Sequence, residues 1–161
     1  MMPWRLHDGI GHFNVTNWVL PKQLISTISL KAYTIAMKKF SKAFLKCISE
    51  TQITSVRAGK GREKFTGIWM VEVDDRIFGR SYNLSERSWY TALLNGESGD
   101  IKCGKEIIPI KGLKPADMKS ITESINKAYE KKYLVKAYNK KWVDGLIQPE
   151  RVARTMEFIP V

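Results

Sequence analysis

The chain has 161 residues, 43% of them hydrophobic, and a formal net charge of +11 at pH 7. This length and apolar content suit one domain around a single core, and no run of about eighteen apolar residues is present to span a membrane. The first residues lack the basic start and the continuous apolar run of a secretion signal. Cys47 and Cys103 do not make a disulfide framework, so we expect a cytoplasmic protein.

The positive charge predicts an anionic partner. Eleven lysines and no arginine lie between residues 102 and 142, against four acidic residues. A phosphorylated cofactor and a nucleic acid are both candidate partners, and a solvated lysine-rich surface explains the charge equally well. Because a lysine face lacks the bidentate forks of arginine, nucleic acid is the less favoured partner.

The histidines of the chain are confined to its start, at His7 and His12. A domain that begins near residue 37 therefore contains no histidine, which excludes from it Ser-His-Asp triads, Cys-His pairs and zinc sites with histidine ligands. Catalysis in such a domain requires a cofactor, or the side chains of Lys, Tyr, Asp and Glu.

The composition changes at Met37, which divides the chain into residues 1–36 and 37–161. The first part is an N-terminal extension, either a genuine helix with a weak apolar period or a stretch upstream of a true start at Met37. In the second part, Ser41 is placed to cap a helix, with Phe40 before it and Leu45 inside it arranged as a hydrophobic staple.

Short alternating runs separated by turn residues follow this helix. They predict six strands, at residues 53–58, 66–73, 76–82, 100–103, 106–111 and 154–159. Helices are predicted from Ser85 to Leu94 and from Pro115 to Lys132, with a Lys- and aromatic-rich connector over 133–144. Short strands in hairpins, interrupted by helices, indicate an α+β fold: a small antiparallel split β-barrel of about six strands with flanking helices.

Within residues 66–73 the alternation assigns the side chains to two faces. Trp69, Val71 and Val73 share one face, and Ile68 and Met70 lie on the other.

The junction between the third strand and the next helix carries the candidate binding residues. Strand ends and helix starts present free N–H groups, and arginine and serine side chains add donors for an anion. The candidate phosphate ligands at this junction are Arg80, Ser81, Tyr82, Ser85, Arg87 and Ser88. The alternative is an ordinary capped helix whose arginines pair with Glu72, Asp74 or Glu86.

Aromatic residues stand close to the same junction. A planar ring can be flanked by side chains from Trp69, Tyr82, Trp89 and Tyr90, although at least two of these are expected to fill the core. Arg57 and Lys64 flank the first hairpin; Arg57 is a further candidate ligand, whereas Lys64 is expected to be a solvated surface residue. Cys103, with no histidine or second cysteine expected nearby, is expected to be inert.

Three segments resemble one protein family. The block from Gly67 to Tyr90 has a strand with Trp-x-Val-x-Val, a turn, an Arg-Ser-Tyr strand end and a Trp-Tyr pair. Residues 128–133 match Ala-Tyr-x-x-Lys-Tyr, and residues 149–160 resemble the closing segment. Together they are similar to the prokaryotic family known as domain of unknown function 2255, over about residues 37–161.

That family looks like a branch of the flavin-binding split β-barrels, which include pyridoxamine-phosphate oxidase and the deazaflavin-dependent reductases. The resemblance implies a homodimer in which Arg80 and Ser81 lie near a cofactor phosphate. Ser85, Arg87 and Ser88 resemble the Ser-Arg-Lys cluster of those relatives, with Trp89 in the place of its Lys.

The leading hypothesis is therefore a cytoplasmic homodimer that binds FMN or a deazaflavin and acts as an oxidoreductase on a small molecule. A carrier or sensor without turnover, holding a flavin, haem or other phosphorylated ligand, is the alternative, and a basic nucleic-acid-binding barrel is a third. A barrel that binds no cofactor remains open.

Overall fold

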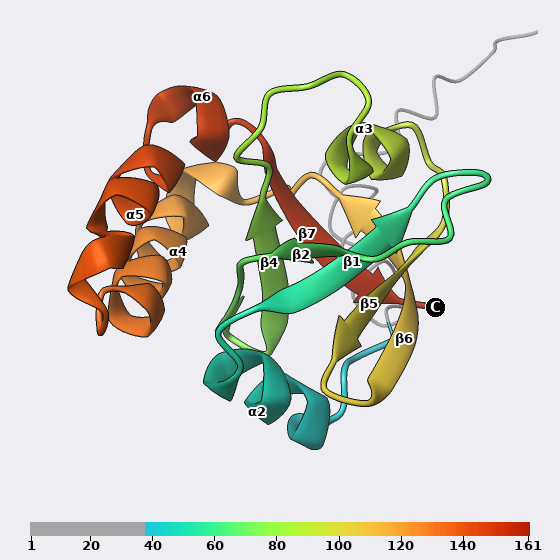
Figure 1. Ribbon diagram of the computed structural model, residues 1–161, viewed down its shortest axis with the longest axis horizontal. Coiled ribbons are helices and arrows are strands. Elements are labelled where there is room, and N and C mark those ends of the chain that lie inside the picture. Colours follow the sequence, from blue (N-terminus) through green and yellow to red (C-terminus); the bar gives the residue numbers. More distant parts are fainter. Residues whose placement is uncertain (1–37) are drawn as a thin grey trace, which may run out of the picture. The chain divides into compact units, whose positions relative to one another are not determined.

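The computed structural model describes residues 38–161 (Figure 1). The predictions for residues 1–36 and for a start at Met37 lie outside the described residues. The strands are β1 (Thr54–Ala58), β2 (Thr66–Ile68), β3 (Met70–Val73), β4 (Arg76–Arg80), β5 (Gly99–Cys103), β6 (Glu106–Leu113) and β7 (Thr155–Pro160). The helices are α2 (Lys42–Glu50), α3 (Trp89–Leu94), α4 (Met118–Tyr133), α5 (Lys140–Leu146) and α6 (Pro149–Val152), with a 3₁₀ turn, η1 (Ala137–Asn139).

All seven strands belong to one antiparallel sheet in the order β2-β1-β5-β6-β7-β4-β3. The two strands at the ends of this order, β2 and β3, are consecutive in the chain and are separated only by Trp69. The two ends of the sheet must therefore meet at this residue, and the sheet curls into a nearly closed barrel. This confirms the predicted α+β barrel, in which β7 pairs with the early strand β4.

The single strand predicted over residues 66–73 is wrong in one respect, because it is two strands with a break at Trp69. The predicted alternation holds across the break. Ile68 and Met70 pack into the barrel interior, while Trp69, Val71 and Val73 pack against α4 outside it.

Two hydrophobic clusters result. The first fills the barrel and includes buried residues of α2 and α3, and the second lies between the outer face of β3 and β4 and helices α4 and α5. Figure 1 shows α4, α5 and α6 gathered on one side of the sheet, away from α2 and α3. The cavity described below is lined by residues from both sides.

Local chemistry explains where several elements begin. Ser41 accepts a hydrogen bond from the Phe44 N–H at 3.1 Å, which confirms the predicted cap, and Phe40 and Leu45 are both buried in the barrel cluster. Asp74 and Asp75, with φ of 53° and 61°, make the turn between β3 and β4, because two left-handed residues match the twist of a tight hairpin.

Several predicted boundaries differ from the structure. The strand expected over 76–82 ends at Arg80, and the strand expected over 106–111 extends to Leu113. The helix expected from Ser85 begins only at Trp89. The helix expected from Pro115 begins at Met118, with Asp117 at its N-cap position. The connector expected over 133–144 is largely helical, as η1 and α5. Within residues 38–161, no helix is long and apolar enough to cross a bilayer, and no cluster of candidate metal ligands occurs.

A disulfide joins Cys47 of α2 to Cys103 of β5, with their Cα atoms 6.2 Å apart. The expectation that no second cysteine lies near Cys103 is therefore wrong. A cysteine count cannot show that two residues 56 positions apart meet in the fold. Because disulfides persist mainly in oxidising compartments, the cysteines no longer support the prediction of a reducing cytoplasm.

We predict that the disulfide stabilises the domain by about 4 kcal/mol, the loop-closure estimate for this separation. Addition of a phosphine reductant should lower the thermal midpoint of the wild type, measured by circular dichroism. The Cys47→Ser, Cys103→Ser double variant should already have the lower midpoint and should not respond to reductant. Equal midpoints for oxidised wild type and double variant would contradict the prediction.

Candidate functional site

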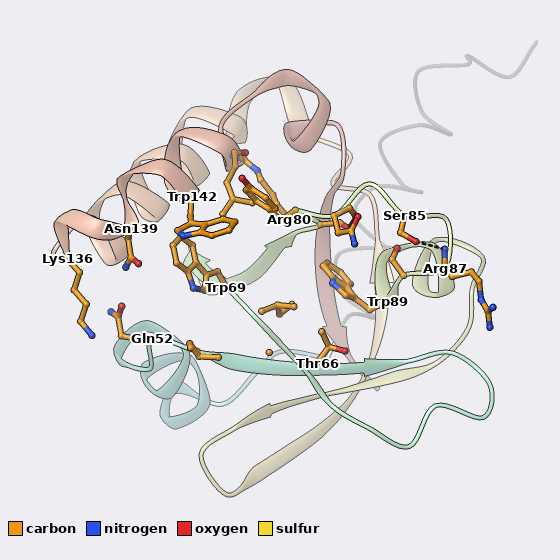
Figure 2. Close-up of a pocket in the computed structure, with 18 of the residues that line it drawn as sticks. Gln52, Thr66, Trp69, Arg80, Ser85, Arg87, Trp89, Lys136, Asn139 and Trp142 are labelled. Carbon is orange, nitrogen blue, oxygen red and sulfur yellow. Dashed lines mark hydrogen bonds between the residues drawn. The ribbon is translucent and has the colours of Figure 1, made fainter.

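A cavity of about 670 Å³ opens between the barrel and the α4–α5 side of the molecule (Figure 2). It is bordered by the segment after α2, by β2 and Trp69, by the end of β4 and the loop that follows it, and by η1 and α5. Eight of the nine residues proposed from sequence as cofactor ligands line it: Trp69, Arg80, Ser81, Tyr82, Ser85, Arg87, Ser88 and Trp89. The fold thus brings one strand end, one loop and one helix start to a common space.

Arg57 is the exception, because it lies outside this cavity. Its Nε and Nη2 donate to Asp100 Oδ2 at 3.1 and 2.8 Å, and its guanidinium lies 4.6 Å from the centre of the Phe65 ring. These contacts tie β1 to β5 and to the approach to β2. Lys64 is exposed and does not line the cavity, in agreement with its expected surface role.

Arg80 lies at the buried end of β4, with only 3% of its surface exposed. Its guanidinium donates to neutral oxygens: Thr155 Oγ1 at 3.0 Å, Asn126 Oδ1 at 2.7 Å and the Leu146 carbonyl at 3.0 Å. Nη2 has no partner within residues 38–161, and burial lowers the pKa of Arg80.

The alternative of ordinary surface ion pairs does not hold for the arginines of this cavity. Within the described part of the chain, no carboxylate pairs with Arg62, Arg80 or Arg87. No Asp or Glu of the described part of the chain lines the cavity, whereas Lys136 adds a fourth cationic side chain to its wall. The cavity is therefore electropositive.

The loop from Ser81 to Ser88 uses its hydroxyls locally. Ser81 donates to the Asn83 carbonyl at 2.8 Å, Ser85 accepts from the Arg87 N–H at 3.3 Å, and Ser88 accepts from the Thr91 N–H at 3.2 Å as the cap of α3. Figure 2 shows the Arg87 side chain extending outward from the rim. The loop thus gives the cavity an exposed, hydroxyl-bearing rim that leads into the start of α3.

Arg154 holds this loop in place through its backbone carbonyls. It donates to the carbonyls of Leu84 and Ser85 at 2.9 and 3.3 Å, and its guanidinium lies over the Tyr90 ring, 4.8 Å from the centre. Tyr90 and Trp89 are both buried in the barrel cluster, as expected for two of the four aromatic residues.

The other two aromatic residues, Trp69 and Tyr82, each pack against neighbouring side chains. Trp69 is stacked on Tyr133 with ring centres 4.1 Å apart and planes within 7°. Tyr82 lies edge-on to Trp142, with the two ring centres 5.0 Å apart. The Arg151 guanidinium carbon lies over the Tyr82 ring, 4.5 Å from its centre. Gly145 permits this packing, because a Cβ there would lie 2.8 Å from the Tyr82 ring.

Helix α4 holds the strand break that directs Trp69 toward the cavity. The Tyr133 hydroxyl accepts from the Met70 N–H at 3.1 Å and donates to the Met70 carbonyl at 3.0 Å. The Tyr129 hydroxyl accepts from the Arg80 N–H at 3.0 Å and donates to the Trp69 carbonyl at 3.3 Å. These bonds replace ladder bonds that the chain loses where it bends.

Lys132 completes this arrangement. Its Nζ donates to the carbonyls of Ile48 and Met70, which joins the end of α2 to the start of β3. Burial lowers the pKa of this amine to about 8 and raises that of Tyr129 to about 12.

Sequence reasoning missed the rest of the cavity wall. The lining residues that were not proposed from sequence are Gln52, Ile53, Arg62, Thr66, Gly67, Ile68, Asn83, Lys136, Tyr138, Asn139, Trp142 and Leu146. The Lys- and aromatic-rich composition of residues 133–144 was a signal for part of this wall. Nothing in the local pattern of Gln52 or Arg62 indicated their position.

Comparison with known proteins gives a family but no activity. The family model described as "Uncharacterized protein conserved in bacteria (DUF2255)" matches residues 43–158. Among solved structures, the chain is similar to the conserved hypothetical protein Rv2991 from Mycobacterium tuberculosis, with a TM-score of 0.45, 12% identity, and coverage of 78% of this chain and 82% of that one. No curated protein matches the sequence.

We predict that Tyr133→Phe destabilises the domain by about 1–3 kcal/mol, because it leaves the buried Met70 N–H unpaired while keeping the ring beneath Trp69. Chemical denaturation measures the free energy of unfolding. Tyr138→Phe is the matched control, since Tyr138 is 72% exposed. An equal, negligible effect of both substitutions would refute the role assigned to the Tyr133 hydroxyl.

We predict that the stability of the wild type, relative to that of the Lys132→Met variant, rises with pH. Above pH 8 the folded protein releases the Lys132 proton, whereas the unfolded chain holds it up to its ordinary pKa of 10.5. The unfolded state then binds more protons, so the free energy of unfolding rises between pH 8 and 10. Above pH 10 the buried tyrosines lower the stability of the wild type and the variant alike, because their unfolded forms lose protons first, and the difference between the two proteins is unaffected. Parallel pH profiles for wild type and variant would disprove this assignment.

Proposed function

This chain belongs to the bacterial family DUF2255, and we propose that it binds FMN or a deazaflavin in this cavity. The bound cofactor would transfer electrons to or from a small organic molecule. One observation carries the proposal. A single cavity combines three tryptophans and two tyrosines with four cationic side chains, and no carboxylate from residues 38–161 lines it. Aromatic faces suit a planar ring, and cations without acidic partners suit a phosphate.

The parts of the cavity suggest how such a ligand is held. Arg62 and Arg87 are exposed and free to close on a phosphate at the rim, where Ser85 adds a hydroxyl. Trp69 offers a ring face that Tyr133 keeps in place. Arg80 contributes positive charge from the protein interior, where a low dielectric strengthens its effect.

The proposed reaction assigns the chemistry to the cofactor. A flavin or deazaflavin supplies hydride transfer itself, and the protein supplies binding, orientation and electrostatics. Among residues 38–161, no His, Asp or Glu lines the cavity, and the phenol and amine groups that these residues place there belong to Tyr82, Tyr138 and Lys136. These residues would orient the ring and its reaction partner.

The same lining favours a second candidate, a carrier that holds the cofactor without turnover, because the described residues of the cavity include no carboxylate or histidine for acid–base catalysis. The two functions separate on one measurement. A bound flavin that is bleached by a reduced nicotinamide and reoxidised by an added acceptor indicates an oxidoreductase. A flavin that stays oxidised under these conditions indicates a carrier.

We also propose the homodimer that the family resemblance implies. Apolar side chains that line the cavity are strongly exposed in the single chain, including Ile53 at 66%, Tyr138 at 72% and Trp142 at 46%. A partner that covers them would remove this apolar surface from water. Light scattering after gel filtration measures the mass of the assembly directly.

We predict that the protein binds FMN and that the Arg62→Ala, Arg87→Ala double variant weakens FMN binding about tenfold, equivalent to about 1.4 kcal/mol. Riboflavin, which lacks the phosphate, should bind the wild type and the double variant equally. Quenching of flavin fluorescence during titration gives both dissociation constants.

Arg57→Ala is the matched control, because Arg57 is also an arginine of the barrel but lies outside the cavity. It should leave FMN affinity unchanged. A wild type that binds neither FMN nor a deazaflavin after gel filtration would overturn the proposed function. An unchanged FMN affinity in the double variant would instead remove the phosphate site from the rim.

A further inference from the structure

The cavity has two chemically different ends. Figure 2 shows Arg87 and Ser85 at one end and Gln52, Lys136 and Asn139 at the other, with Trp69 and Trp142 beside the second group. The first end offers charged and hydroxyl groups at an exposed rim. The second end offers two carboxamides, which are neutral and can both donate and accept hydrogen bonds.

The two carboxamides are fixed on the same structural element. Gln52 Nε2 donates to the Lys132 carbonyl at 3.2 Å, and Asn139 Nδ2 donates to the Tyr133 carbonyl at 2.9 Å. These consecutive carbonyls belong to the last turn of α4, where helix carbonyls lack intrahelical partners. Residues 87 positions apart in the chain thus converge on one helix end.

These contacts also determine how each amide is oriented. A carbonyl only accepts hydrogen bonds, so the nitrogen of each carboxamide must face the helix and its oxygen must face away from it. Each amide retains one N–H and its oxygen for other partners. Asn139 is 6% exposed, so its orientation is held within the protein and not by solvent.

We infer that Gln52 and Asn139 bind the polar edge of a planar ring in which an N–H lies between two carbonyl groups. One amide oxygen accepts from the ring N–H, and the remaining amide N–H groups donate to the two ring carbonyls. The ring lies against Trp69 and Trp142, and its phosphate-bearing tail extends to Arg62 and Arg87. This inference rests on the proposed function and adds to it the orientation and the recognised class of ring.

The chemistry of this edge is selective. Flavins and 5-deazaflavins share a pyrimidinedione ring, whose edge has the required order of carbonyl, N–H and carbonyl. A haem edge carries no such group, so the amide pair favours a flavin-type ring over the haem considered from sequence. A matched set of amide groups rejects a ring that cannot complete its hydrogen bonds, because buried polar groups are then left unpaired.

The test compares FMN with 3-methyl-FMN, in which a methyl group replaces the ring N–H. The wild type should bind 3-methyl-FMN about tenfold or more weakly than FMN, the effect of one lost hydrogen bond at a buried site. Gln52→Met and Asn139→Ala should each weaken FMN binding and reduce this discrimination to about twofold or less. Both variants should weaken riboflavin and FMN equally, whereas the rim double variant weakens FMN alone.

Gln148→Met is the matched control, because Gln148 also donates its amide to a backbone carbonyl, that of Asp144 at 3.0 Å, but lies outside the cavity. This variant should discriminate between FMN and 3-methyl-FMN to the same extent as the wild type. Gln52→Met provides the result if Asn139→Ala fails to fold.

Two results overturn the inference and are distinguishable from each other. If FMN binds but Gln52→Met retains full discrimination against 3-methyl-FMN, the amide pair does not read the ring edge, and the proposed function stands. If the wild type binds neither FMN nor a deazaflavin, the proposed function fails and the inference fails with it.

Discussion

The sheet closes because one chain segment turns through a break at Trp69, and the rest of the structure depends on how that break is held. A strand that bends loses ladder hydrogen bonds, and buried peptide groups without partners are costly. Here two tyrosine hydroxyls and one lysine amine from α4 supply the missing partners. The barrel is therefore completed by side chains of a helix outside it, and the same helix fixes the ring of Trp69 at the cavity.

This arrangement gives a physical reason for the Ala-Tyr-x-x-Lys-Tyr segment. Lys132 and Tyr133 lie three and four residues after Tyr129, so both neighbour it on the surface of α4. Their polar ends contact the backbone of Trp69 and Met70, or that of Arg80 on the neighbouring strand. Lys132 also binds the end of α2, which the disulfide ties to β5. The segment after α2 then leads directly into the cavity wall at Gln52, so one wall is fixed from two sides.

The sequence predicts the local parts of this fold and much of one side of the site. Alternation assigned Ile68 and Trp69 to the correct faces, and turn residues separated the runs 66–73 and 76–82, because these signals act over a few residues. The break at Trp69 carried no signal, since a tryptophan without nearby proline suits a continuous strand, and its cause lies sixty residues away in α4. Arg57 was misplaced for a similar reason: its partner, Asp100, is on a strand that only the folded sheet brings beside it.

Arg80 gives a physical reason why the proposed anionic ligand would stabilise the folded protein. A buried guanidinium normally requires a carboxylate, because neutral oxygens offset only part of the cost of removing its charge from water. Arg80 has three neutral partners and one nitrogen without any within the described residues, and its pKa is lowered accordingly. Placing an anion in the cavity would offset this charge through a region of low dielectric, without direct contact. A ligand bound by the folded state alone must also raise its stability. The proposed anionic ligand would thus reduce the cost of burying the Arg80 charge.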